Sequence, residues 1–550
     1  MVPNFFVKLT SIPLTPNGKV NRKTLPEISE ENIVKKTYIA PQTAIEAALV
    51  SIWQEILNVE KIGITDNFFE LGGHSLLAGK IINEISKRLH KNLSLKYIFQ
   101  NQTIQELAKS LEIVTAENIV IPKASLKAAY PITKDQESIW LATQMEDFSN
   151  AYNMYSIFTI NGIIDYQSLE NEINQVIEEN EILRTNFIES QGEVLQSISK
   201  KVDFKIDIHK IDKEELSKSI TEFVSYEFNL HTDLLLKVAI FEVDDNEKHL
   251  AFLTHHIIVD GISLELLLAK LISLYKTEEV NTIYNDFQFK DYTEWVRQEQ
   301  NFKSFASFFN SKVAKTKALI SNSPLGYTKS KIKEFDKELY STLKEISNTN
   351  KTSVFTVIAT AVNVVLSKIL QQQEITLATI FSGRDHRDLE SQIGMFVKTL
   401  PLQLNIDQES SLQQLLKICN DQLLLINENN NVPLQINLNQ LTDFMFVYQK
   451  GNKAMENEIN FGEFILERNN VIKTKSRFPI VFNFFESDTL RCEIEYSEVI
   501  GETYLQLILD KFEILIDLLE TSLSAKISSL DLTTIEEKQI LGSVEIDFDF

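Results

Sequence analysis

Apolar residues recur with a helical period in the first part of the chain. Between Gln42 and Asn58 they are spaced at close to 3.6 residues, which predicts an amphipathic helix with one buried face. Similar patterns predict a second helix from about Ser75, a short turn at Tyr97–Phe99 and a last helix at Ile104–Leu111. We therefore predict a small all-α bundle of four helices over residues 39–112.

From about residue 130 the pattern changes to alternating strands and helices. Apolar alternation predicts strands at Tyr155–Ile160, Leu234–Phe241 and Leu250–Val259. Helical periods predict helices at Tyr166–Glu179, Ile262–Tyr275, Ser353–Leu370 and Leu412–Ile426. This succession predicts an α/β architecture that extends to about residue 530.

Composition narrows the class of protein. The 550 residues are enough for about three to four domains. A net charge of −23 disfavours binding to nucleic acid or to an anionic membrane surface. No apolar run approaches the ~20 residues of a membrane span, and the N-terminus lacks the layout of a signal peptide. The two cysteines, Cys419 and Cys492, have no metal-binding spacing. We expect a cytoplasmic protein without a metal site.

Three segments differ from the regions of regular pattern. Residues 1–26 hold four basic and no acidic residues, together with several prolines, so they predict a short extended piece without its own core. Residues 28–38 and 113–129 are predicted to be linkers. The acidic segment 531–550 is predicted to be the start of a linker to a following domain.

Ser75 follows two glycines at the predicted start of a helix. One interpretation is an N-cap, in which the hydroxyl accepts a backbone N–H. The other is an attachment point for a phosphodiester, because free N–H groups and the positive end of the helix dipole favour a phosphate there. The residues alone leave both interpretations open.

The lead-in favours the second interpretation. The stretch from Asp66 to Leu77 resembles the phosphopantetheine-attachment motif of peptidyl carrier proteins from non-ribosomal peptide synthetases. The resemblance implies that Ser75 carries 4′-phosphopantetheine, with Gly73, His74 and Leu76 around the site. It also implies a phosphopantetheinyl transferase that uses coenzyme A. Residues 1–27 resemble the C-terminal end of an adenylation domain, in which Lys19 matches a lysine that contacts the acyl-adenylate.

A pair of histidines closes the strand predicted at Leu250–Val259. Side chains alternate across a strand, so His255 and His256 are expected to point to opposite faces, and Asp260 and Gly261 form the turn into the next helix. A metal site is disfavoured because adjacent strand residues diverge and no further ligand is near. Two core histidines, or one histidine that handles protons beside a turn stabilised by a carboxylate, remain as interpretations.

The string from His255 to Gly261 matches the His-His-x-x-x-Asp-Gly motif of the chloramphenicol acetyltransferase-like superfamily, which includes condensation domains. Other segments before and after this string resemble further motifs of condensation domains, and they occur in the order that the family has. Together with the carrier and adenylation-domain resemblances, they cover essentially the entire chain. They are Tyr130–Trp140, Glu181–Phe187, Phe289–Trp295, Ser382–Arg384, Ile393–Pro401, Val432–Leu434 and Phe444–Val447.

This resemblance implies roles for individual residues. His256 is implied to be catalytic, with His255 and Gly261 beside it, and Asp260 is implied to be a scaffold residue paired with an arginine. Arg184 and Arg384 are the candidates, and we favour Arg184 because it follows an apolar helix face and leads into a strand.

The chain departs from the family pattern in a few places. Glu179-Asn180 replaces a usual Arg-His pair, and Lys398 stands where the family favours asparagine. Asn429 and Leu434 replace a usual histidine and phenylalanine. These departures concern the surroundings of the site and the acceptor side, and leave His256 unaffected.

The resemblance implies a complete architecture and activity. A four-helix carrier precedes a two-lobed α/β condensation domain, with lobes at about 130–300 and 301–530 and a tunnel that leads to His256 from both sides. The carrier holds an aminoacyl or peptidyl thioester as donor. The condensation domain joins it to the α-amine of an aminoacyl thioester on a downstream carrier, in an assembly with upstream and downstream adenylation domains.

Three other functions share this fold. An epimerisation domain carries the same histidine motif, but the chain has no string of the Glu-Gly-His type, and Gly394–Pro401 favours condensation. A module that only recruits a partner is disfavoured by the intact His256 and Asp260. Heterocyclisation is disfavoured because an aspartate motif would replace the two histidines. Asn153-Met154 resembles domains that accept an L-configured donor.

Overall fold

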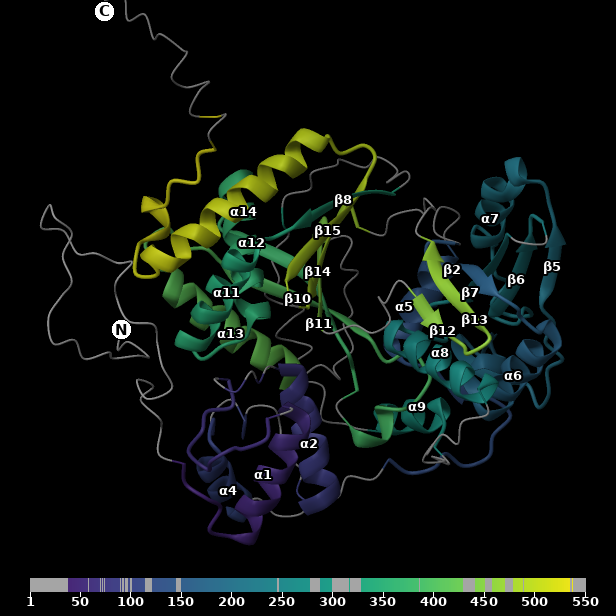
Figure 1. Cartoon of the computed structure of the whole chain (residues 1–550), viewed down its shortest axis with the longest axis horizontal. Helices are drawn as coiled ribbons and strands as arrows, with labels where there is room; N and C mark the ends of the chain where they lie inside the picture. Colours follow the sequence, from purple (N-terminus) through teal and green to yellow (C-terminus); the bar gives the residue numbers. More distant parts are fainter. Residues whose placement is uncertain are drawn as a thin grey trace, which may run out of the picture. The chain divides into compact units, whose positions relative to one another are not determined.

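The structure is a computed structural model, shown in Figure 1. It describes residues 38–57, 59–69, 71, 73, 75–89, 91, 93, 97–98, 101–113, 121–144, 150–244, 247–276, 287–298, 316, 328–384, 386–428, 441–450, 458–469, 478–487, 489–534 and 537. The predicted adenylation-domain remnant at 1–27 lies outside the described residues, as do most of the predicted segments 28–38 and 531–550. The chain divides into two compact units, Met1–Asn118 and Ile119–Phe550.

The described residues of the first unit form three helices around one apolar core. These helices are α1 (Ala44–Leu57), α2 (Ser75–Leu89) and α4 (Ile104–Ile113). The three predicted helices are confirmed, each starting within two residues of its predicted position. The core includes side chains from all three helices and from the loop before α2, namely Leu49, Trp53, Phe68, Ile81, Ile85 and Leu107.

The second unit contains three sheets. The N-terminal lobe holds a six-stranded sheet of strand order β12-β13-β2-β7-β6-β5, and the C-terminal lobe one of order β10-β9-β11-β14-β15-β8. A small third sheet has the order β1-β4-β3, formed by β1 (Tyr130–Pro131), β4 (Glu193–Ile198) and β3 (Thr185–Ser190).

The strand bounds show how well the apolar alternation located the strands. In the N-terminal lobe they are β2 (Asn153–Gly162), β5 (Asp207–Lys210), β6 (Leu236–Glu242), β7 (Lys248–His255), β12 (Glu458–Asn460) and β13 (Phe464–Asn469). In the C-terminal lobe they are β8 (Thr328–Glu334), β9 (Glu374–Phe381), β10 (Lys398–Asn405), β11 (Phe444–Lys450), β14 (Ile480–Glu486) and β15 (Leu490–Ser497). The three predicted strands are present, but β7 ends at His255, four residues before its predicted end.

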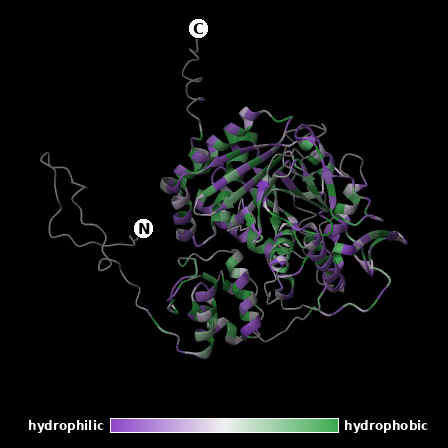
Figure 2. Ribbon diagram, turned by 45° about the vertical axis from the view of Figure 1, so that its right-hand side comes forward, coloured by the Kyte–Doolittle hydropathy of each residue, from purple (hydrophilic) through white to green (hydrophobic). Residues whose placement is uncertain are grey.

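Helices cover these sheets, and the four predicted between residues 166 and 426 are confirmed. The N-terminal lobe has α5 (Lys134–Thr143), α6 (Tyr166–Glu179), α7 (Leu216–Val224), α8 (Gly261–Tyr275) and α9 (Phe289–Gln298). The C-terminal lobe has α11 (Lys337–Thr349), α12 (Val354–Leu370), α13 (Leu412–Glu428) and α14 (Glu502–Ser522). Apolar and polar residues alternate along the ribbons of the outer helices (Figure 2).

Helix α12 is the centre of the core of the C-terminal lobe. It is buried along most of its length, because α11, α13, α14 and strand β9 all contact it. In Figure 1 these helices gather on one side of the sheet. Among the described helices, none alone is long and apolar enough to cross a membrane. Helices α11 and α12 reach that length and composition only together, and they are bent by 105° relative to each other.

The two lobes are not consecutive pieces of chain. Strands β12 and β13 come from residues 458–469, yet β13 pairs with β2 in the N-terminal lobe, with Phe464 opposite Gly162. Figure 1 shows them as yellow-green arrows among the blue and teal elements. The predicted division at about residue 300 is therefore wrong for this segment, because a strand pairs according to tertiary contacts rather than to its position in the sequence.

Candidate active site and carrier serine

His256 lies in a turn directly after β7. The strand ends because the Ile258 N–H bonds back to the His255 carbonyl at 3.1 Å, which closes a turn over residues 256–258. The His256 N–H donates to the Tyr152 carbonyl at 2.8 Å. His255 is fully buried and His256 is partly exposed. The two rings differ in environment because one belongs to a strand and the other to a turn, not because both alternate along one strand.

One hydrogen bond determines the chemistry of the His256 ring. Its Nδ1 lies 2.8 Å from the carbonyl oxygen of Val259. A carbonyl oxygen only accepts hydrogen bonds, so Nδ1 carries the proton and donates. In the neutral imidazole, Nε2 then holds the lone pair. His256 is therefore prepared to accept a proton or a hydrogen bond at Nε2.

His255 supports this turn. Its Nδ1 accepts the Ile257 N–H at 3.3 Å, and its ring packs near those of Tyr152 and Phe228 at centroid distances of 6.4 and 6.1 Å. Its register partner in β2 is Asn153, whose amide donates to the carbonyls of Val224 and Tyr226. These contacts are those of a histidine that holds the backbone in place.

Asp260 binds four donors from both lobes. Its Oδ1 accepts the Ser263 N–H at 2.7 Å, which caps α8, and Arg384 Nη2 at 3.0 Å. Its Oδ2 accepts the N–H groups of Phe396 and Val397 at 3.0 and 3.2 Å. The residue is 2% exposed, and both oxygens are engaged twice. This geometry is that of a scaffold carboxylate, which joins the turn of His256 to the segment before β10.

The arginine that pairs with Asp260 is Arg384, so the preference for Arg184 was wrong. Arg384 is buried, and it also donates to the carbonyls of Leu389 and Gln392 and to Ser263 Oγ. Burial lowers the pKa of Arg384, and the charge of Asp260 opposes that shift. Arg184 instead donates to the carbonyls of Ser199 and Glu178, within its own lobe.

The glycines near the site differ in whether a side chain would have room there. Gly383 has φ +65°, and a Cβ there would lie 1.9 Å from the Phe396 carbonyl oxygen, so only glycine fits. A Cβ at Gly394 would lie 2.2 Å from the Phe289 ring. Gly261 is different, because it is exposed and a Cβ there would meet nothing within 4 Å. The structure thus gives no steric reason for glycine at this predicted site residue.

Gln136 also holds the turn, a role that the sequence did not reveal. It is fully buried in the first turn of α5, and its Nε2 donates to the Ile257 carbonyl at 2.9 Å. Its Oε1 accepts the Thr133 N–H at 3.0 Å in a capping box. The spacing of Thr133 and Gln136 is the sequence signal for this cap, but it does not indicate the contact with residue 257.

The predicted attachment site begins α2. Ser75 is the first residue of this helix. The first N–H groups of a helix have no partner within the helix, so the start of a helix is a suitable position for a phosphate. A Cβ at Gly73 would lie 2.5 Å from the ring of Phe68, and this ring packs on Trp53 at 5.3 Å. Phe68 therefore packs between Gly73 and the core residue Trp53. These features fit 4′-phosphopantetheine on Ser75. His74 and the side chains of Ser75 and Leu76 lie outside the described part.

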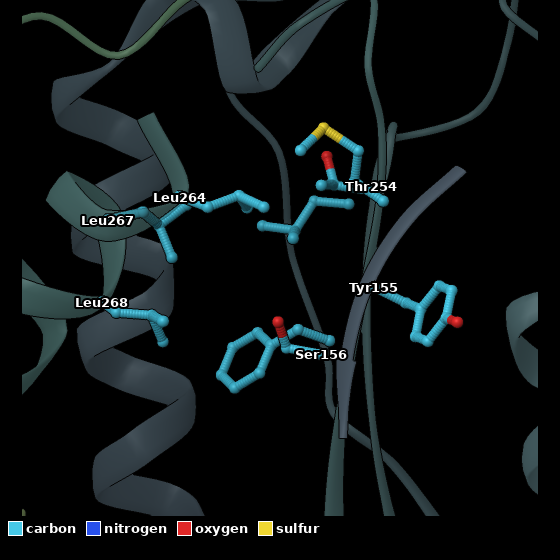
Figure 3. A pocket seen from close by; sticks show the side chains of 9 residues that line it. Tyr155, Ser156, Thr254, Leu264, Leu267 and Leu268 are labelled. Carbon is cyan, nitrogen blue, oxygen red and sulfur yellow. The ribbon is translucent and has the colours of Figure 1, made fainter. Parts of the chain in front are cut away.

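A small cavity lies near the site, between α8 and strands β2, β6 and β7. Figure 3 shows Leu264, Leu267 and Leu268 facing Thr254 and Ser156 across it, while Tyr155 projects to the other side of its strand. Its volume of about 20 Å³ has room for about one water molecule. It is too small for an acyl arm. Among the described residues, no group of three or more His, Cys, Asp or Glu is placed to hold a metal ion.

Comparison with protein families identifies both units. The family model of the condensation domain matches residues 127–541, and that of the phosphopantetheine attachment site matches residues 47–111. The chain belongs to the condensation-domain family. The resemblance to a peptidyl carrier followed by a condensation domain is thus confirmed, and the first unit carries the domain to which phosphopantetheine is attached.

Related synthetases match over most of this chain. Gramicidin S synthase 2 of Brevibacillus brevis is 31% identical over 479 residues, which are 82% of this chain and 11% of the relative. Tyrocidine synthase 3 of Brevibacillus parabrevis is 28% identical over 569 residues, 98% of this chain and 9% of the relative. The chain spans about a tenth of the length of the curated relatives it matches.

Solved structures confirm the fold. The X-domain from teicoplanin biosynthesis has a TM-score of 0.68 at 16% identity, over 75% of this chain and 99% of that one. A four-domain nonribosomal peptide synthetase bound to AMP and glycine has a TM-score of 0.66 at 16% identity, over 77% of this chain and 35% of that one. The predicted two-lobed α/β fold of the condensation domain is thereby confirmed.

Proposed function

We propose that this chain forms amide bonds in non-ribosomal peptide synthesis. The carrier domain, which we place at 39–112, presents an aminoacyl or peptidyl donor, and the condensation domain at 130–530 joins it to an amine. The observation that carries the proposal is the hydrogen bond from His256 Nδ1 to the Val259 carbonyl, because it leaves Nε2 as the basic atom of a partly exposed ring.

The chain's own residues supply positioning and a proton acceptor. Phosphopantetheine on Ser75 supplies, when bound, a thiol that holds the acyl group as a thioester. His256 Nε2 accepts a hydrogen bond from the attacking α-amine and takes its proton as the C–N bond of the amide forms, a contribution typically worth ~10²–10⁴-fold. The C–S bond of the donor thioester breaks, and the proton held by Nε2 passes to the departing sulfur, which leaves as a thiol. The α-amine has a pKa of about 7.7–8.0, so a strong base is not needed. Asp260 and Gln136 hold the turn that carries His256, and His255 supports this turn by accepting the Ile257 N–H.

The function requires further partners. A phosphopantetheinyl transferase with coenzyme A modifies Ser75, an upstream adenylation domain supplies the donor, and downstream adenylation and carrier domains supply the acceptor. Cytoplasmic localisation fits these partners. A tunnel from both sides to His256 and an L-configured donor remain predictions.

The test uses the full chain with the donor loaded on Ser75. A phosphopantetheinyl transferase and a dipeptidyl coenzyme A derivative load the chain, a free aminoacyl pantetheine thioester serves as acceptor, and mass spectrometry follows the product. We expect His256→Ala to load normally and to form product ~10²–10⁴-fold more slowly. His249→Ala is the control, since it removes a histidine from the same strand away from the turn. Ser75→Ala should show no mass increase at all.

The same experiment separates the alternatives. An epimerisation domain would change only the chirality of the loaded residue and would form no joined product. A module that only recruits a partner would load and leave both substrates unchanged. Near-normal product from loaded His256→Ala would contradict the assignment of His256.

A further inference from the structure

The segment between the carrier and the condensation domain is attached to the condensation domain over its second half. The sequence predicts a linker at residues 113–129, and residues 121–129 of it lie along α9 without regular secondary structure. We call residues 121–129 the strap. Ile121 at its start is 4% exposed and belongs to the apolar core of the N-terminal lobe. The tether of the carrier therefore meets the condensation domain at Ile121, nine residues before β1 begins at Tyr130.

Helix α9 presents two acidic residues to the strap. Asp291 Oδ1 accepts the Ala124 N–H at 2.8 Å. One turn later, Glu294 forms an ion pair with Lys127. The spacing is three residues on both sides, so one face of α9 follows the strap. The Lys127 N–H also donates to the Tyr130 hydroxyl at 3.1 Å, which holds the end of the strap near β1.

The hydrogen bond to Asp291 is the strongest of these polar contacts. Asp291 is 2% exposed, and its Oδ2 accepts the Gln288 N–H at 2.7 Å at the start of α9. A buried carboxylate requires donors for both of its oxygens, and the strap supplies a donor for Oδ1. The ion pair of Glu294 is more exposed and contributes little. Release of the strap would take a donor away from a buried charge, which favours the attached state.

Attachment of the strap shortens the free part of the tether. Seven residues, 114–120, separate the end of α4 at Ile113 from Ile121. Without the attachment, the free tether would run to Tyr130 and would contain 16 residues. A fully extended chain spans at most about 3.3–3.6 Å per residue, so the strap reduces the reach of the tether from about 61 Å to about 29 Å.

We propose that the strap sets the effective concentration of the Ser75-bound donor at the active site. Effective concentration is the concentration of dissolved donor that would react as fast as the tethered donor. For a flexible tether it falls with about the −3/2 power of the length, so an increase from 7 to 16 residues should lower it about threefold. The strap thus favours the chain's own carrier over a donor in solution. This inference rests on the proposed function and concerns how the donor is delivered.

A competition experiment measures this effective concentration in the full chain. Ser75 carries the donor, an isotopically labelled copy of the donor is dissolved as a pantetheine thioester, and a free aminoacyl pantetheine thioester is the acceptor. Mass spectrometry gives the ratio of the two products. That ratio multiplied by the concentration of the dissolved donor is the effective concentration of the tethered one. The chain without phosphopantetheine gives the rate from the dissolved donor alone.

Two variants lengthen the free tether by different means. The double variant Ile121→Ser with Ala124→Pro removes the core contact and the N–H that Asp291 accepts, and it leaves the sequence of α9 unchanged. The insertion variant keeps the strap and adds nine glycine and serine residues after Asn118. We expect the product ratio to fall about threefold in both variants, while the rate from the dissolved donor alone stays at the wild-type value. Leu126→Pro is the control, because it places a proline in the strap at a side chain that is 95% exposed.

Hydrogen exchange tests the attachment independently of activity. In the chain without phosphopantetheine, the amides of residues 121–130 should exchange faster in the double variant than in the wild type. In the insertion variant and in Leu126→Pro the remaining amides of this segment should exchange at the wild-type rate. Unchanged protection in the double variant would overturn the inference, because the contacts of Ile121 and Ala124 would then not hold the strap.

The other outcomes separate the inference from the function. A product ratio that stays constant in both lengthened chains, or that falls in only one of them, overturns the inference and leaves the function intact. Equal slowing of both products in the double variant, with a lowered melting temperature, shows a purely structural strap and also overturns it. A wild-type chain that forms no product from either donor refutes the proposed function, and the inference falls with it.

Discussion

Asp260 shows how a single carboxylate defines the site without taking part in the chemistry. Its two oxygens accept four hydrogen bonds, from Ser263, Arg384, Phe396 and Val397. Both oxygens are thus occupied by donors of the protein itself. Its contribution to the proposed reaction is therefore geometric, because it caps α8 and holds the turn that presents His256.

The first prediction compares the two arginines. Arg384→Met leaves a buried carboxylate without its counter-charge, so we expect the condensation domain to lose about 3 kcal/mol of unfolding free energy. Arg184→Met removes hydrogen bonds to two carbonyls on a partly exposed side chain, and should cost about 1 kcal/mol. Urea titration followed by tryptophan fluorescence measures both. Equal losses of unfolding free energy in the two variants would show that the ion pair of Arg384 with Asp260 stabilises the domain no more than the hydrogen bonds of Arg184 do.

The resemblance in the sequence implies that Asp260 pairs with an arginine, but it does not identify which arginine. Arg184 stands between an apolar helix face and a strand, as predicted, yet its guanidinium binds carbonyls of its own lobe. Arg384 is 124 positions from Asp260 and reaches it only because the two lobes meet there. Local patterns carry no information about such a contact. The same reason hid the contact of Gln136 with Ile257.

At the scale of elements, the helices that the sequence predicts are present with nearly the predicted bounds, whereas the end of β7 is not where the sequence predicts it. The apolar run through Val259 does not distinguish a strand from a buried turn, since Ile257, Ile258 and Val259 are all buried. The turn forms because the Ile258 N–H bonds to the His255 carbonyl. The crossing of β12 and β13 into the other lobe's sheet leaves no trace in a periodic pattern either.

The second prediction concerns this crossing. Gly162 has φ +126°, and a Cβ there would lie 2.6 Å from the Glu463 carbonyl oxygen, where β13 approaches β2. Gly162→Ala therefore combines backbone strain with a clash, and should cost about 3 kcal/mol or more. Gly192 also has a positive φ, +79°, but a Cβ there meets nothing within 4 Å. Gly192→Ala should cost only about 1–2 kcal/mol.

Hydrogen exchange gives the specific readout for this pair. In Gly162→Ala the amides of β13 should exchange faster than those of β6 and β7, because β13 can no longer approach β2 closely at residue 162. In Gly192→Ala the amides of β13 should remain as protected as in the unchanged chain. Equal protection of β13 in the two variants would contradict the role given to Gly162.

At the scale of the whole molecule, the chain consists of two compact units with separate apolar cores. The change of period near residue 130 predicts a division into a helical and an α/β part. A separate core implies that a substitution inside the carrier changes the stability of the carrier alone. Two glycines of the carrier provide a matched pair for testing this, because one is crowded and the other is not.

The last prediction uses these glycines. Gly73→Ala places a methyl group against the buried ring of Phe68, and shifting that ring disturbs its packing on Trp53, so we expect a loss of about 1–3 kcal/mol. Gly79 lies inside α2 with nothing within 4 Å, so Gly79→Ala should add about 0.5–1 kcal/mol through helix propensity. Calorimetry of the full chain should show the carrier transition moving down in one variant and up in the other. The condensation transition should stay in place in both, because its cores share no side chain with that of the carrier. A condensation transition that moved with the carrier would mean that the two units unfold as one.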